Sequence, residues 1–168
     1  RQVRHDAHLV ATAPPERVRD ELLKLLAAPG ATKWLRSLFD LGLLLEIVPE
    51  LSDAVGVTQP REHYWNVFDH LLETTGQVER ILQPRAGAAG FVADIAPRFE
   101  SMSAHFQQVV SDGHTRLAMI KLTGLLHDIA KPATKTVESS GRMRFLGHHT
   151  AGAVMAEAVL KRLRFSGR

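Results

Sequence analysis

A histidine and an aspartate stand side by side, His127-Asp128, near the end of an apolar stretch, and Lys131 follows three residues later. In a helix two adjacent side chains point about 100° apart, so both could lean towards one cation if a neighbouring helix completed the site. An imidazole nitrogen and a carboxylate oxygen are ordinary ligands of divalent metals. Taken alone, however, the pair is better explained by a buried, hydrogen-bonded histidine.

Further histidines change that interpretation. His70 lies in a long apolar-periodic segment before the pair, and His148-His149 open the segment after it. The order His … His-Asp … His, from three predicted helices, resembles the HD superfamily of metal-dependent phosphohydrolases. The resemblance implies that His70, His127, Asp128, His148 and His149 bind a divalent cation.

A metal site of this kind has a defined chemistry. A bound cation polarises a phosphoryl oxygen and lowers the pKa of bound water towards about 7. Oxygen-rich coordination suits Mn²⁺ or Mg²⁺, whereas more imidazole suits Ni²⁺, Co²⁺, Zn²⁺ or Fe²⁺. The sequence contains no cysteine, which excludes thiolate zinc sites and disulfides. We therefore expect a divalent metal held by histidine and carboxylate, with His127 and Asp128 as catalytic residues.

Several other side chains are candidates for contact with substrate. Lys131 could attract a phosphate and assist catalysis, although a lysine at a helix C-terminus is also favoured by the helix dipole. His63 lies seven residues before His70, nearly on the same face of a continuous helix, and is either a substrate group or a surface residue. Arg144 is a third candidate for binding substrate. Either His148 or His149 could instead hold a second metal, bind phosphate or protonate the leaving group.

The elements that position these residues are predicted to be helices. Apolar periodicity predicts helices over the ranges 16–28, 32–41, 64–82, 95–109, 117–129 and 148–164, with a short apolar segment at 43–48. Trp34, Phe99, Val109 and Val154 are expected on the core faces. Residues 52–61 are expected to form a loop, and 84–90 a turn. The range 135–145 is predicted as a small β-hairpin with a Gly turn. The expected fold is therefore all-α, a helical bundle of HD-domain type.

Composition sets broad limits. The chain has 168 residues, 45% of them hydrophobic and 23% charged, which is typical of a globular protein. No apolar run approaches the roughly 20 residues that span a bilayer. We expect a cytoplasmic protein without a membrane partner. The formal net charge of +3 permits nucleic-acid binding without establishing it.

A wider resemblance covers residues 16–168. The segment 16–22 is similar to the entry into the helical region of the bacterial tRNA nucleotidyltransferase/poly(A) polymerase family, and Gly42-Leu43-Leu44 with 48–51 is similar to that family's GLL … PEL pattern. The HD segments follow in the family's order. The resemblance implies an RNA-binding segment over 1–60, an HD domain over 61–168, and nucleotide or tRNA phosphates as partners.

Two features of that family are missing from the sequence. No two aspartates stand two residues apart and there is no Gly-rich loop, so the nucleotidyltransferase head is absent from this sequence, and nucleotide addition is expected only if a head lies upstream of Arg1. HD proteins also supply a further aspartate from a later helix, and no aspartate follows Asp128. We expect that position to fall beyond Arg168, so that the HD domain is truncated.

Three hypotheses follow. The first is a phosphohydrolase region that acts on phosphomonoesters or phosphodiesters, among them nucleotides, 2′,3′-cyclic nucleotides or RNA ends. The second is a non-catalytic RNA-binding body in which the HD residues only hold helices together. The third is a nucleotide-sensing module that binds its ligand without turnover.

Overall fold

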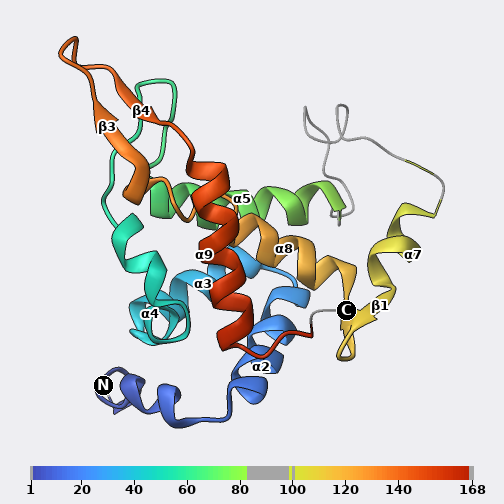
Figure 1. Ribbon diagram of the computed structural model, residues 1–168. Helices are drawn as coiled ribbons and strands as arrows, with labels where there is room; N and C mark the ends of the chain where they lie inside the picture. The colour runs from blue at the N-terminus through green and yellow to red at the C-terminus, as the bar shows by residue number, and fades with distance from the viewer. Residues whose placement is uncertain (1, 83–98, 100, 167–168) are drawn as a thin grey trace.

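The computed structural model describes residues 2–82, 99 and 101–166, and these residues form a helical body with two small hairpins (Figure 1). The helical segments are α1 (Gln2–His5), η1 (Ala7–Thr12), α2 (Pro15–Ala27), α3 (Ala31–Asp40), α4 (Leu43–Ile47), η2 (Pro49–Ala54), α5 (Val67–Leu82), α7 (Met102–Gln107), α8 (Arg116–Leu126), η3 (Pro132–Thr134) and α9 (His148–Arg162). The antiparallel strand pairs are β1 (Val109–Ser111) with β2 (His114–Thr115), and β3 (Lys135–Val137) with β4 (Met143–Phe145). The expected all-α class is confirmed.

Proline and glycine delimit the helices. Pro15 occupies the first position of α2, where its missing N–H costs no hydrogen bond. Gly42 adopts φ +80° immediately before α4, a conformation that glycine reaches without the steric cost of a Cβ. The chain therefore turns sharply between short helices, and their apolar faces meet in one core.

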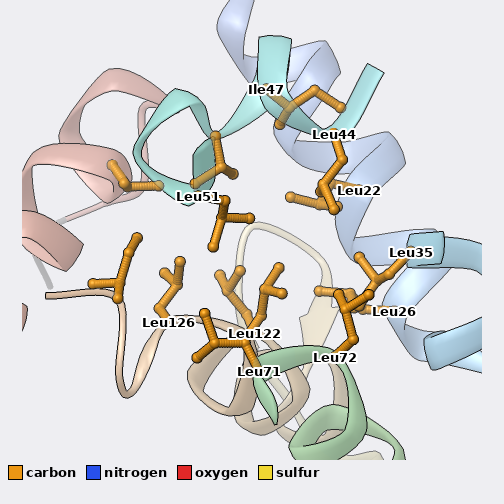
Figure 2. Close-up of a cluster of buried hydrophobic side chains, with 14 of the residues drawn as sticks. Leu22, Leu26, Leu35, Leu44, Ile47, Leu51, Leu71, Leu72, Leu122 and Leu126 are labelled. Carbon is orange, nitrogen blue, oxygen red and sulfur yellow. The ribbon is translucent and has the colours of Figure 1, made fainter. Parts of the chain in front are cut away.

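That core joins the first and second parts of the chain. Figure 2 shows leucine and isoleucine side chains from α2, α3, α4, η2, α5 and α8 pointing into one cluster: Leu22, Leu26, Leu35, Leu44, Ile47, Leu51, Leu71, Leu72, Leu122 and Leu126. All of them are buried. The hydrophobic core is therefore shared by the residues on both sides of the predicted domain boundary near residue 60.

Within the described residues, the expected helix over 95–109 is confirmed only for Met102–Gln107, which form α7. The helix α7 ends at Gln107, and Val109 lies instead in the β1–β2 hairpin with 64% of its surface exposed. Asp112 and Gly113 form the turn, both with positive φ, and an Asp-Gly pair after β-branched residues is a strong hairpin signal. Phe99 is also exposed. Ile95 and the expected turn at 84–90 lie outside the described residues.

Other boundaries shift by a few residues. The helix α5 begins at Val67 rather than at residue 64, because the side-chain oxygen of Asn66 accepts the Asp69 N–H at 2.9 Å and caps the helix. The expected loop over 52–61 begins with the end of η2. The side chains of Trp34 and Val154 are exposed, not in the core as expected, because their helices turn other faces inward. No helix in the described ranges is long and apolar enough to cross a membrane.

Candidate metal centre

The carboxylate of Asp128 is the centre of the candidate site. It lies in the turn after α8 with 6% of its surface exposed. Its Oδ2 atom lies 3.2 Å from His70 Nε2, 3.1 Å from His127 Nε2 and 2.7 Å from Lys131 Nζ. Its Oδ1 atom lies 3.3 Å from His148 Nε2. One buried carboxylate therefore gathers three imidazoles and one ammonium.

Close packing of α5 on α8 brings two of these histidines together. Gly124 of α8 lies against Thr75 of α5, and a Cβ at residue 124 would stand 3.3 Å from the Thr75 Cα, tighter than ordinary contact. Without that side chain the two helices approach, so that the rings of His70 and His127 lie 5.2 Å apart. His148 is the first residue of α9, the helix that follows the β3–β4 hairpin in the chain (Figure 1), and its Nε2 reaches the same carboxylate.

The ring orientations suit metal binding. His127 Nδ1 lies 2.9 Å from the Gly124 carbonyl oxygen, and His148 Nδ1 lies 2.6 Å from that of Phe145. When each Nδ1 donates its hydrogen to that carbonyl, the Nε2 lone pair of the neutral ring faces Asp128. Potential ligand atoms of His70, His127 and Asp128 all lie within 4.8 Å of one another. This donor set fits a divalent cation.

The charges around Asp128 keep it ionised. Burial raises the pKa of its carboxyl, but hydrogen bonds from His127, His70 and Lys131 outweigh burial and hold the pKa well below its usual range. The hydrogen bond to Asp128 raises the pKa of His127, against the opposing effect of burial. A deprotonated carboxylate is the form that a metal requires.

The remaining predicted site residues lie at different distances from this centre. The exposed His63 ring packs edge-on against His70, 5.9 Å between centroids, and burial followed by the Lys131 charge lowers its pKa. The exposed His149 packs on His148 and is not among the groups paired with Asp128 in the described ranges. Arg144 pairs with Glu138 across the β3–β4 hairpin at 2.9 Å.

One buried side chain of the site has no signal in the sequence. Gln59 is 8% exposed; its Oε1 accepts from Lys131 Nζ at 2.7 Å and its Nε2 donates to the Trp65 carbonyl at 3.1 Å. It therefore links the buried Lys131 to the loop before α5. A glutamine before a proline in a loop carries no periodicity, so only the fold could reveal it.

Comparison with known families agrees with this geometry. Residues 67–166 match the HD domain, the larger part of the chain. This chain belongs to the HD-domain family. Ahead of the HD domain, residues 1–55 match a family described as the probable RNA and SrmB-binding site of polymerase A. The resemblance to nucleotidyltransferase tails with HD domains is thereby confirmed.

Individual relatives are tRNA nucleotidyltransferases. The chain is 33% identical over 153 residues to the A-adding tRNA nucleotidyltransferase of Deinococcus radiodurans. The matched region covers 90% of this chain and 28% of the relative. It is 32% identical over 160 residues to the CC-adding tRNA nucleotidyltransferase of Thermus thermophilus, covering 95% and 30%. A Multifunctional CCA protein of Pseudomonas aeruginosa is 25% identical over 166 residues, covering 98% and 32%. The chain with its HD domain thus spans about a third or less of these relatives' length.

Proposed function

We propose that this chain is a metal-dependent phosphohydrolase region of a tRNA nucleotidyltransferase-like protein. It would hydrolyse phosphomonoesters or phosphodiesters of nucleotides, 2′,3′-cyclic nucleotides or RNA ends. One observation carries the proposal: three imidazole nitrogens and Lys131 converge on the buried carboxylate of Asp128. A histidine with a purely structural role needs one hydrogen-bond partner. Three imidazoles and an ammonium around one carboxylate are more than such a role requires.

The proposed roles follow from position. His70, His127 and Asp128 would hold the divalent cation, and His148 stands near enough to join them or to meet a phosphate oxygen. The cation, when bound, supplies a polarised phosphoryl oxygen and an activated water. The Lys131 ammonium offers positive charge to the phosphate from a largely buried position, where charges interact more strongly than in water.

Direct metal measurement tests this proposal. After equilibration with Mn²⁺, Ni²⁺ or Zn²⁺, the parent chain is expected to retain about one metal per chain, and the His127→Ala variant to lose most of it, because one of three ligands is gone. Metal-dependent phosphate release from nucleotides should fall in parallel. His105→Ala, which removes a histidine outside the cluster, is the matched control. Equal turnover by the parent and His127→Ala would contradict the proposal.

The comparisons also favour a second function, RNA binding by the N-terminal part, because residues 1–55 match a family described as RNA-binding. Exposed basic side chains such as Arg17 and Lys33 would contact phosphates there. A non-catalytic body of this kind remains the alternative to the hydrolase. The division near residue 60 and the cytoplasmic location stay predictions.

Salt dependence tests the RNA-binding function. Affinity for tRNA is expected to fall at least about tenfold between about 50 and about 200 mM salt, because neutralising two or more phosphates releases counterions. Filter binding or fluorescence anisotropy measures it. Arg17→Glu with Lys33→Glu should weaken binding, whereas Lys161→Glu, on α9, is the control. A tRNA affinity that changes neither with salt nor in the Arg17→Glu, Lys33→Glu variant would rule out this interface.

A further inference from the structure

Two exposed aromatic side chains lie in the loop just before α5, the helix that carries His70. Tyr64 is 91% exposed and Trp65 is 38% exposed, and their rings meet edge to face with 5.3 Å between centroids. Aromatic side chains usually contribute to stability by being buried, and two exposed rings in contact offer a surface on which a ligand could pack.

The loop that carries them is held in place. The Val67 N–H donates to the Val57 carbonyl at 2.8 Å, which closes the loop at the start of α5. Lys135 Nζ donates to Thr58 Oγ1 and to its carbonyl oxygen, each at 3.0 Å, and so fixes the loop against the β3–β4 hairpin. Figure 1 shows this loop running beside the hairpin. The aromatic pair therefore sits on an anchored segment.

The same loop is tied directly to Asp128. Lys131 bonds both the Asp128 carboxylate and Gln59, and Gln59 in turn bonds the backbone of Trp65. His63, the residue before Tyr64, packs its ring against the ring of His70. The two contacts tie the backbone around the aromatic pair to the cluster where a phosphate would react.

We propose that Tyr64 and Trp65 form a base-stacking site, which holds the nucleobase of the nucleotide whose phosphate ester reacts at the Asp128 cluster. The inference rests on the proposed function and names the residues that would hold the base. Every nucleobase has a π-face that stacks on an aromatic ring without regard to sequence. A metal-bound phosphate and a stacked base would hold the two ends of one nucleotide, which a simple sugar phosphate cannot offer.

Tryptophan fluorescence provides the test. The chain has two tryptophans, so Trp34→Phe leaves Trp65 as the single reporter. In that background with Mg²⁺, adenosine 5′-monophosphate is expected to quench Trp65 and to bind at least about tenfold more tightly than ribose 5-phosphate. Tyr64→Ala should remove most of that difference and Tyr64→Phe should preserve it. Phe99→Ala, at another exposed aromatic, is the control.

Inorganic phosphate is followed in the same samples, which separates the two proposals. Preferential binding of adenosine 5′-monophosphate without phosphate release supports the stacking site and contradicts hydrolysis of this phosphomonoester. Equal affinities for the two compounds, or Tyr64→Ala binding like the parent, overturn the stacking site whether or not phosphate is released. A dinucleotide with a terminal phosphate distinguishes the source of the base: tighter binding than the mononucleotide indicates an RNA end, and equal binding indicates a free nucleotide.

Discussion

The Asp128→Asn variant is expected to lose its divalent metal, with affinity reduced by at least about 100-fold and metal-dependent hydrolysis reduced to background. Ligand-orienting partners alone are typically worth about 10-fold to 100-fold in affinity, and a direct ligand should exceed that. Asp128 is the only carboxylate in the described cluster and faces three imidazoles and the Lys131 ammonium. An amide of the same shape leaves that positive charge uncompensated, so a cation would be repelled rather than attracted.

Metal titration calorimetry and phosphate release measure this effect. The variant also leaves the buried Lys131 without its anionic partner, so its folding is checked by circular dichroism and binding is measured well below the unfolding temperature. Asp69→Asn is the matched control, because Asp69 precedes His70 on α5 but pairs with Arg36 and Asn66. Metal retained at full stoichiometry by Asp128→Asn would show that Asp128 is not a ligand and that the metal binds elsewhere.

The ligand cluster was more predictable than its surroundings. The order of His70, His127-Asp128 and His148 along the chain is a signal made of three short local sequences, and the three histidines do converge on Asp128. Gln59 had no such signal, because its partners Lys131 and Trp65 are set by tertiary contacts. The role of each residue as ligand or catalyst stays a prediction that only metal and substrate measurements can test.

Helix existence was likewise more predictable than helix packing. Apolar periodicity predicted where helices form. It could not predict which apolar residues have no other segment packed against them. Phe99 continues an apolar spacing and is nevertheless exposed, while Trp34 turns outward with its indole N–H donating to the Pro29 carbonyl. Local spacing defines a helical face, whereas burial depends on what another segment places against it.

Loss of a buried ion pair should have the largest effect on stability. Lys121 of α8 is fully buried, and its ammonium lies 3.0 Å from Glu79 Oε2 of α5 and 3.3 Å from the Ala28 carbonyl. The Glu79 carboxylate also accepts the N–H groups of Gly30 and Ala31 at 2.6 and 2.9 Å, at the start of α3. Glu79→Ala leaves a buried ammonium uncompensated, which costs about 3–5 kcal/mol. We expect the unfolding temperature to fall by about 10 °C.

The pH dependence of stability tests whether the charge of Glu79 stabilises the fold. Burial raises the pKa of Glu79, but the bonds from Gly30, Ala31 and Lys121 outweigh it and leave the pKa below its ordinary 4.5. A carboxyl whose pKa is lowered on folding contributes stability that is complete above its unfolded pKa and is lost as pH falls through the folded pKa. The stability deficit of Glu79→Gln, measured by urea unfolding, should therefore shrink as the solution is acidified. A deficit that stays constant across that range would mean that the charge of Glu79 has no part in it.

The same pair tests whether the RNA-binding match and the HD domain unfold as one unit. Glu79 lies in the HD match and caps a helix of the N-terminal match, and the hydrophobic core is shared by both parts. We therefore expect one cooperative transition in the parent and in Glu79→Ala. Glu79→Leu with Lys121→Met should recover part of the lost stability, because an apolar pair removes the buried charges together but leaves the N–H groups of Gly30 and Ala31 without their acceptor. Two separate transitions in the parent would show instead that residues 1–60 fold independently of the metal centre.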